Sequence, residues 1–404
     1  MSSNLMRVWS DNMIITDDNG WFISGGLNML FNMNLKTGEC HFVADFPDSE
    51  LSRFRMNQVQ IKQGRYILCL PDRGKTVWLY DSLDEKLKEL GFLNLDLKRL
   101  AIINEFIVND SLFVVASEKK QIIEISWNGQ LDFKYFDIFR HIELGNLGNE
   151  SVLVKQKIYC VCDLSNEVCE FDVMTKKSKY YPVCGVKNGL TTICYDGSFF
   201  WLSGFDRELY VWDKTKMQTR ILHEFPIEFG FYEIDDPGQV RVNNEKRAET
   251  SLFVKSIDGK DSLWFIPFQT NKILYVEKTD FSIHIFDLPG ETEDSVSWRR
   301  GMNVKYVVEY FRNKNIVGLY SFKNNNIVEI DIDKKKISYI IPFINEEDKT
   351  KIWSILFQES QMLSERDAED LNLFLREAEM QKNNIKVINE LIGNKIYEES
   401  RSMQ

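Results

Sequence analysis

The chain has 404 residues, of which 44% are hydrophobic and 13% aromatic, so it holds enough apolar material for a packed globular core. Its formal net charge of -11 argues against wrapping nucleic acid or lying on an anionic membrane, because either use needs a dominant basic face. The N-terminus lacks an apolar signal segment, and no run approaches the roughly 18 apolar residues of a membrane-spanning helix. We therefore predict a cytoplasmic protein that binds neither nucleic acid nor membrane.

The first regular feature along the chain is an extended run, a short polar turn and a second extended run that ends on an acidic or amide residue. This pattern is typical of a β-hairpin, and a β-rich segment precedes and follows the hairpins, which gives four strands per copy. The first copy spans residues 19–39, and six more begin at Gly64, Asp110, Gln156, Asp196, Asp261 and Asn313.

The residue at which the third strand of each copy enters its turn marks the repeat. These marker residues are Asn34, Asp81, Ser126, Asp172, Asp213, Glu277 and Asp331. The steps between them are 47, 45, 46, 41, 64 and 54 residues, and the two longest steps contain insertions. The first four steps match the roughly 40–50 residues of propeller repeats. We predict an all-β fold, a seven-bladed β-propeller of four-stranded antiparallel blades over residues 1–345, with a C-terminal α-helical extension over residues 346–404.

In three copies a glycine-containing turn precedes a tryptophan of the second strand: Gly20 with Trp21, Gly197 with Trp201, and Gly259 with Trp264. This pattern resembles the degenerate repeats of kelch-like and regulator-type propellers over residues 7–343. The resemblance implies the fold and leaves the function open, since such propellers include lyases, hydrolases, lectins and scaffolds. We expect the glycine to adopt a positive φ and the tryptophan to fill the wedge between blades. The kelch diglycine occurs only at Gly25-Gly26, and the paired signature of WD40 blades does not recur.

The seven cysteines are odd in number and mostly sit in apolar, strand-like runs, which favours reduced, buried thiols over a disulfide framework. Cys160 and Cys162 alternate along one predicted strand and would share a face, as two ligands of a soft metal would. No second cysteine pair accompanies them, and the chain has only four histidines. We predict neither a metal site nor a cofactor.

The connections from the last strand of one blade to the first strand of the next gather at one end of a propeller's channel, where ligands usually bind. Each of the six connections contains at least one cation, although acidic residues are interleaved with them and ordinary solvated loop charge remains an alternative. Arginine forks suit carboxylate, sulfate or phosphate groups, and an aromatic ring adds a stacking surface. The predicted ligand-binding residues are Arg53, Arg55, Arg99, Arg140, Arg247, Trp298, Arg299 and Arg300.

The catalytic signal is weaker than the binding signal. His141 is the one histidine in such a connection, and an acid such as Glu105 or Glu150 with an arginine would complete a general acid–base site. The other three histidines, His41, His223 and His284, occupy outer-strand positions. No nucleophile, metal-protease or phosphate-loop motif is visible.

Three functions follow from this pattern. The favoured hypothesis is a non-catalytic recognition or assembly module that binds a protein partner or small anionic ligand at the arginine-rich face. The first alternative is a lyase or hydrolase acting on an acidic sugar, a phosphorylated substrate or a peptide. The second is a scaffold that docks through its C-terminal helices.

The sequence beyond the repeats contains two unusual segments. The connection over residues 227–249 is expected to be a long loop whose aromatic residues cover the channel, meet a partner or pack against the propeller wall. From Glu359 onward helix formers replace β-branched residues, with Ser364 and Asp367 spaced as a capping pair. These helices are either a brace on the propeller or a docking element for a partner or a second copy, which would make a homo-oligomer.

Overall fold

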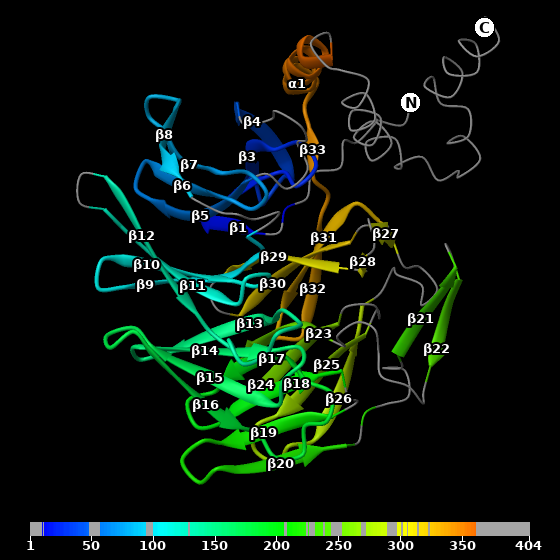
Figure 1. Ribbon diagram of the computed structural model, residues 1–404. Coiled ribbons are helices and arrows are strands. Elements are labelled where there is room, and N and C mark those ends of the chain that lie inside the picture. The colour runs from blue at the N-terminus through cyan, green and yellow to red at the C-terminus, as the bar shows by residue number, and fades with distance from the viewer. Residues whose placement is uncertain are drawn as a thin grey trace, which may run out of the picture. The chain divides into compact units, whose positions relative to one another are not determined.

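The computed structural model describes residues 10, 12–47, 57–93, 100–127, 130–205, 208–223, 225, 231–236, 239–243, 253–267, 272–288, 297–299, 302–304, 306–312, 315–321 and 324–360. Their strands form seven antiparallel sheets in which four consecutive strands lie in chain order, and the chain has the fold of a seven-bladed β-propeller (Figure 1). The predicted fold class is confirmed.

The four strands of each blade follow one another without a crossover. Blades 1 to 3 comprise β1 (Met13–Thr16), β2 (Asn19–Ile23), β3 (Met29–Asn34) and β4 (Glu39–Asp45); β5 (Asn57–Gln63), β6 (Tyr66–Pro71), β7 (Thr76–Asp81) and β8 (Lys86–Phe92); β9 (Ile102–Val108), β10 (Ser111–Ala116), β11 (Gln121–Trp127) and β12 (Leu131–Asp137). Blades 4 and 5 comprise β13 (Leu147–Val154), β14 (Lys157–Cys162), β15 (Glu167–Asp172) and β16 (Lys177–Pro182); β17 (Leu190–Tyr195), β18 (Phe200–Gly204), β19 (Leu209–Asp213) and β20 (Gln218–Leu222). Blades 6 and 7 comprise β23 (Phe253–Asp258), β24 (Ser262–Pro267), β25 (Lys272–Glu277) and β26 (Ile283–Asp287); β29 (Tyr306–Arg312), β30 (Ile316–Ser321), β31 (Asn326–Asp331) and β32 (Lys336–Ile340).

Two short hairpins lie in connections between blades. β21 (Phe231–Asp236) pairs with β22 (Gln239–Asn243) between blades 5 and 6, and β27 (Ser297–Arg299) pairs with β28 (Met302–Val304) between blades 6 and 7. The long connection after blade 5 was expected to be a loop. Instead its alternating segment forms a two-stranded sheet, because antiparallel pairing satisfies backbone groups that a loop would leave to solvent.

The chain divides into two compact units. One contains residues 1–89, 325–327 and 339–404, and the other contains residues 90–324 and 328–338. The first holds blades 1 and 2 with the C-terminal elements, and the second holds blades 3 to 6 with most of blade 7.

Burial changes systematically from the second strand of a blade to the fourth. All five residues of β18 are buried, whereas β12 alternates between half-buried and exposed positions. A middle strand has neighbours on both faces, so its sequence is continuously apolar, while an edge strand keeps a solvated side. This explains why the predicted hairpins, which are the second and third strands, were the clearest signal in the sequence.

The repeat markers have a local structural role. Asp172 Oδ1 accepts the N–H groups of Met174 and Thr175 at 2.9 Å each, and the side-chain oxygens of Asn34, Asp81, Asp213 and Asp331 cap the following turns in the same way. Four residues after six of the seven markers the backbone adopts a positive φ, at Gly38, Glu85, Lys176, Met217, Phe281 and Lys335. The marker therefore sets the turn from third to fourth strand through a side-chain–backbone bond.

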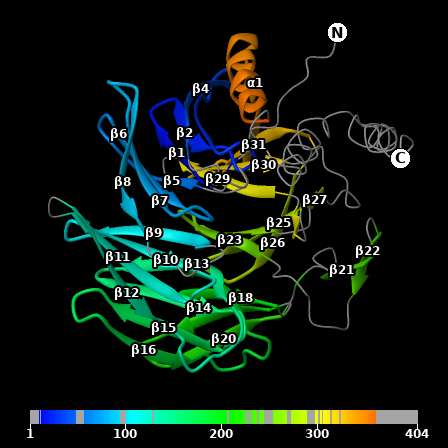
Figure 2. The same ribbon diagram turned by 45° about the horizontal axis from the view of Figure 1, so that its top comes forward.

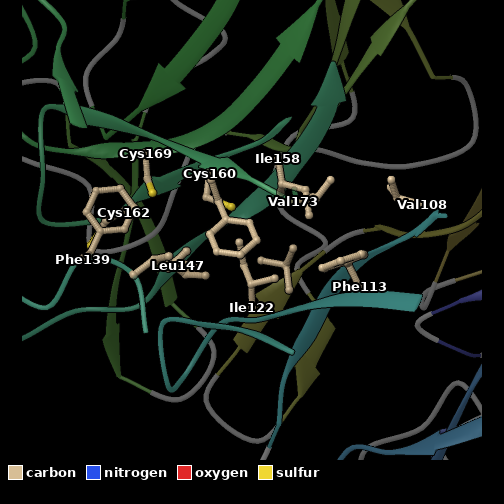
Figure 3. Packing of buried hydrophobic residues seen from close by; sticks show 13 residues of the cluster. Val108, Phe113, Ile122, Phe139, Leu147, Ile158, Cys160, Cys162, Cys169 and Val173 are labelled. Atoms are coloured by element: carbon tan, nitrogen blue, oxygen red, sulfur yellow. The ribbon is translucent and has the colours of Figure 1, made fainter. Parts of the chain in front are cut away.

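The cysteines are free thiols, and six of the seven are buried, while Cys184 is exposed. Cys160 and Cys162 on β14 pack with Cys169 on β15 in one hydrophobic cluster that joins blades 3 and 4 through residues such as Phe113 and Ile158 (Figure 3). The predicted burial of thiols in strands is confirmed for these three, and Cys160 and Cys162 do share a face.

The expected positive φ of the glycine before the tryptophan is found in one of the three copies. Gly197 has a φ of 97°, but neither Gly20 nor Gly259 adopts a positive φ. At Gly20, a Cβ would lie 2.3 Å from Met13 Sδ on the neighbouring strand, so the methionine side chain packs against the glycine. The expectation about tryptophan burial holds better, since Trp201 and Trp264 are both fully buried.

The C-terminal segment packs on blade 1. β33 (Phe343–Ile344) pairs in parallel with β4, and α1 (Glu346–Ser360) follows, lying beside β4 in both views (Figures 1 and 2). Asn345 Oδ1 caps the helix by accepting the Asp348 N–H at 2.8 Å, and Asp348 Oδ2 accepts the Phe42 N–H at 3.1 Å. The helix begins at Glu346, before Glu359, because this cap, the acidic first turn and buried Ile352 favour it. These contacts favour the brace hypothesis for α1; the helices predicted beyond residue 360 lie outside the described residues.

Replacement of Gly38 by alanine should destabilise the protein by roughly 2 kcal/mol or more. Gly38 has a φ of 79°, and a Cβ there would lie 2.2 Å from the Ile341 carbonyl oxygen, so strain and a clash coincide. Gly197→Ala is a matched control, because Gly197 also has a positive φ but a Cβ added there would meet no atom within 4 Å. Urea unfolding of both variants measures the difference, and equal losses would contradict the close approach of Gly38 to Ile341.

The acid stability of the turns should depend on Asp213. Hydrogen bonds from the Thr215 side chain and the Lys216 N–H lower the pKa of Asp213 to about 2. A folded-state pKa below the unfolded value means that the stabilisation is present above roughly pH 4 and is lost as the pH falls towards 2. Asp213→Asn should therefore lose less stability than the wild type between these pH values in thermal unfolding. Glu118→Gln, at an exposed position, should follow the wild type.

Candidate functional site

Most of the predicted ligand-binding residues lie outside the described part of the chain. This applies to Arg53, Arg55, Arg99, Arg247 and Arg300. Trp298 and Arg299 belong to β27, where Trp298 pairs with Asn303 and Arg299 with Met302. Trp298 and Arg299 therefore lie on a paired strand.

Arg140 and His141 are the predicted site residues whose side chains are described, and both lie in the connection between blades 3 and 4. Arg140 is 75% exposed and forms an ion pair with Asp137 at 2.7 Å. His141 Nε2 lies 2.6 Å from Glu167 Oε2, and its ring packs edge-on against Tyr180. His141 thus contacts the third and fourth strands of blade 4, where Glu167 is its hydrogen-bond partner.

The same connection is held at several points along its backbone. The Lys120 ammonium donates to the carbonyl oxygens of Ile142 at 2.5 Å, Glu143 at 3.3 Å and Leu144 at 3.4 Å. These three carbonyl oxygens therefore accept hydrogen bonds from the same ammonium group. Leu144 at the end of this group remains 74% exposed. From this held backbone the connection exposes Arg140, His141, Glu143, Leu144 and Asn146.

A second polar cluster lies on the first strands of blades 4, 5 and 6. Glu150 on β13 is only 5% exposed, and Ser256 Oγ on β23 donates to its Oε2 at 2.5 Å. The backbone N–H groups of Ser256 and of Ile193 on β17 also donate to this carboxyl group. One carboxyl group thereby links three blades, and Asn149 adds a bond from blade 4 to the Phe253 carbonyl oxygen of blade 6 at 3.3 Å.

The protonation of this cluster is set by burial. Burial raises the pKa of Glu150 to about 7, and the nearby Lys255 ammonium and the hydrogen bonds from Ser256 and Ile193 offset only part of that rise. Burial also raises the pKa of the Cys194 thiol on β17, and the charge of Glu150 adds to it. Cys194 is therefore a protonated, weakly nucleophilic thiol near neutral pH.

Blade 3 joins the same polar system through an amide. Asn104 Oδ1 on β9 accepts the Ser151 N–H at 2.8 Å and lies 3.1 Å from Ser151 Oγ. In blade 5, the hydroxyl oxygens of Thr192 and Ser203 lie 2.5 Å apart. These buried side chains have found partners among themselves, as buried polar groups must.

Further from the first strands, a buried carboxylate joins blades 4 and 5. Glu170 on β15 accepts hydrogen bonds from Lys157 at 2.6 Å, from Tyr159 Oη at 2.8 Å and from Lys214 of the next blade. The Lys214 ammonium also lies over the rings of Tyr159 and Tyr181, 5.1 and 4.8 Å from their centroids. Burial alone would raise the pKa of Glu170, but these donors outweigh it and lower the pKa.

This arrangement recurs between other blades of the second unit. Lys176 of blade 4 pairs with Glu124 of blade 3 at 2.7 Å and lies over the Phe113 ring. Lys335 of blade 7 lies over the Tyr275 ring of blade 6. We call each such combination of a carboxylate and an aromatic ring, filled by a lysine of the following blade, a lysine socket.

The lysine sockets were not predicted from the sequence, although the sequence contains a signal for the carboxylates of two of them. Glu124 and Glu170 each precede a repeat marker by two residues, and an acid in the middle of a continuously apolar strand needs a partner. The identity of that partner was not visible, because Lys214 is 44 residues from Glu170.

Among the described residues, no group of three or more histidine, cysteine, aspartate or glutamate side chains is arranged to hold a metal ion. Within the same residues, no helix has both the length and the apolar character needed to cross a membrane.

The sequence matches no family model and no curated protein. Among solved structures the chain is similar to U3-55K, with 9% identity, coverage of 78% of this chain and 89% of that chain, and a TM-score of 0.51. It is also similar to the dihydro-heme d1 dehydrogenase NirN in complex with DHE, at 12% identity, 82% coverage of this chain and a TM-score of 0.48, and it spans 65% of that chain. The computationally designed Ika8 protein aligns at 12% identity over 82% of this chain and 86% of that chain, with a TM-score of 0.43.

Similarity at this level of identity defines the fold alone, and the class of the protein is a seven-bladed β-propeller. The kelch-like character of the repeats remains a prediction.

The lysine socket of Glu170 should contribute measurably to stability. Lys214→Met should cost roughly 1–3 kcal/mol, because it removes one of two ammonium groups from a carboxylate whose side chain is only 2% exposed. Urea unfolding measures this loss. A double-mutant cycle with Glu170→Gln should give a coupling free energy above about 1 kcal/mol.

Lys216→Met is the matched control for this measurement. Lys216 is 69% exposed and pairs with Asp213 at 3.2 Å, so its loss should change the free energy of unfolding by less than about 0.5 kcal/mol. A Lys214→Met variant that behaves like this control would show that the socket contributes no more than a surface ion pair.

Proposed function

We propose that the protein is a non-catalytic recognition or assembly module that binds a protein partner or an anionic ligand at the arginine-rich face formed by the connections between blades. The observation that carries this proposal is the internal pairing of the candidate acid–base groups. Glu150 is only 5% exposed and is held by Ser256 and two backbone N–H groups, and His141 Nε2 is bonded to Glu167. A general acid or base must instead be within reach of a substrate proton.

The topology of the second unit supports a shared face. The segments that connect one blade to the next contact the turns between the second and third strands. The Asp163 N–H donates to the Asn146 carbonyl oxygen at 3.0 Å, and Ser117 Oγ donates to the Leu147 carbonyl oxygen at 2.9 Å. After blade 5, His223 lies 2.8 Å from Glu208. Successive connections therefore enter at the same edge of the blades. Arg140, Arg247, Arg299 and Arg300 belong to connections of this kind.

The held connection between blades 3 and 4 supports binding on energetic grounds. Ordering a flexible loop costs free energy on association, and a loop whose carbonyl groups are already fixed by Lys120 avoids much of that cost. Arg140 and Leu144, four residues apart in this connection, offer a cation and an apolar group that are both about three-quarters exposed. A mixed surface of this kind suits a protein or an anionic ligand better than a purely apolar one.

A thermal-shift comparison tests the proposal. Inorganic sulfate, inorganic phosphate, glucuronic acid and a short polyglutamate peptide are added to the wild type and to an Arg299→Glu, Arg300→Glu variant. A ligand at a hundred times its Kd stabilises the folded state by about 2.7 kcal/mol, so binding should raise the Tm of the wild type and not that of the variant.

A charge-matched control uses the opposite edge of the blades. Lys155→Glu with Lys216→Glu introduces the same change in charge at exposed turn positions, and this variant should keep the ligand-induced shift. Loss of the shift in both double variants would mean that net charge, and not the arginine-rich face, governs the response, which would overturn the anion site.

The enzyme alternative has one observation in its favour, which is the pKa of about 7 at Glu150. It predicts that the purified protein releases reducing ends or unsaturated products from a uronic acid polymer and that Glu150→Gln abolishes this release. Such turnover would replace the non-catalytic proposal.

A further inference from the structure

Blades 4 and 6 are not consecutive, yet side chains on their first strands are bonded to each other directly. Glu150 reaches Ser256, and Asn149 reaches the Phe253 carbonyl oxygen. The strand between them in chain order, β17 of blade 5, contributes the Ile193 N–H to the same carboxyl group. The three first strands are thus joined at a single side chain that has almost no contact with solvent.

We infer that Glu150 is a proton-controlled latch that holds the first strands of blades 4, 5 and 6 together when it is protonated and loosens them when it ionises. The latch is independent of whether the connections between blades bind an anion. It therefore goes beyond the proposed function.

The neutral carboxyl group matches its surroundings in hydrogen bonding. Its carbonyl oxygen can still accept the Ser256 hydroxyl and the N–H groups of Ile193 and Ser256. The ionised group would be a carboxylate at 5% exposure, with little water to solvate it. Burial therefore favours the protonated form.

The direction of the pH effect follows from this preference. The pKa of Glu150 in the folded protein is about 7, above the ordinary value of 4.5. The folded state consequently holds the proton more tightly than the unfolded state, and its stability decreases as the pH rises from about 4.5 to about 7. The latch is fully closed below this window and loosest above it.

The surrounding charged and titratable groups set how far the latch can open. Lys255 on β23 lowers the pKa of Glu150 and so favours the open form. Cys194 on β17 is a thiol whose own pKa is raised by burial, by Glu150 and by Asp258 of β23, so it stays neutral in the same range. From β9, the uncharged amide of Asn104 bonds to Ser151, the residue after Glu150, and Glu105 is the acidic residue of that strand. Lys255 is therefore the cation that an ionised Glu150 would face.

Loosening the latch would have a structural consequence for binding. The amide of Asn149 and the hydroxyl of Ser256 are committed to bonds between blades 4 and 6 while the latch is closed. Separation of these strands would free polar groups on three blades at once. Access to the first strands would then be greater in a neutral or alkaline compartment than in an acidic one.

Hydrogen–deuterium exchange of the full chain, read by mass spectrometry at about pH 6 and about pH 8, tests the latch. After correction for intrinsic exchange rates, peptides from β13, β17 and β23 should exchange about tenfold faster at the higher pH, because a group with a pKa of about 7 loses its proton across that range. Peptides from the outer strands β12 and β16 should not show this pH dependence.

Glu150→Gln should remove the pH dependence and keep all three strands protected, since the amide oxygen accepts the same donors from Ser256 and Ile193 and the amide does not ionise. Glu143→Gln, which changes an exposed acid in the preceding connection, should retain the wild-type behaviour. Equal protection of the wild type at both pH values would overturn the latch, as would a Glu150→Gln variant with unchanged pH dependence.

Ser256→Ala provides a second test should the glutamine variant fold poorly. It keeps Glu150 but removes a donor that lowers the pKa of this group, so the midpoint of the exchange transition should move to higher pH. A midpoint that stays in place or moves down would show that Ser256 does not act on Glu150 and would contradict the latch.

Discussion

In the second unit, the packing of neighbouring blades depends on side chains from the turn between the third and fourth strands. Each such side chain contacts the preceding blade. Lys176 and Lys335 do this from backbone positions of positive φ, four residues after a repeat marker, and Phe281 does so from the same position by stacking on Trp201. Backbone strain at these positions is offset in part by the contact that each partly exposed side chain makes. The register between neighbouring blades therefore follows from a turn geometry that each blade builds locally.

Two buried carboxyl groups show how environment decides the state of the same chemical group. Glu170 receives two ammonium donors and a phenol, so its pKa is lowered and it is a carboxylate. Glu150 receives a hydroxyl and two backbone N–H groups with one ammonium nearby, so burial prevails and it holds its proton up to about pH 7. Both link neighbouring blades, but the first does so by charge and the second by neutral hydrogen bonds. Only the second link responds to pH in the physiological range.

The proposed binding function and the internal polar systems use different parts of each blade. First strands and lysine sockets hold their polar groups inward, whereas the connection after blade 3 fixes its backbone through Lys120 and leaves Arg140 and Leu144 outward. A scaffold that satisfies its own buried groups can vary its connections without losing its fold. This separation would let the connections between blades carry the proposed recognition surface without loss of the fold.

The sequence by itself determined the strands, because the signals for them are local: Asp172 caps a turn two and three residues ahead, and a middle strand such as β18 is apolar throughout. It also placed Arg140 and His141 correctly in a connection between blades. Only the tertiary structure decided which polar groups meet, since Glu150 and Ser256 are 106 residues apart and Lys214 and Glu170 are 44 apart. Periodicity reports which residues are buried, but no spacing in one blade specifies which side chain of another blade will lie opposite. The contact that anchors α1 was not visible in the sequence for the same reason, because Asp348 and Phe42 are 306 residues apart.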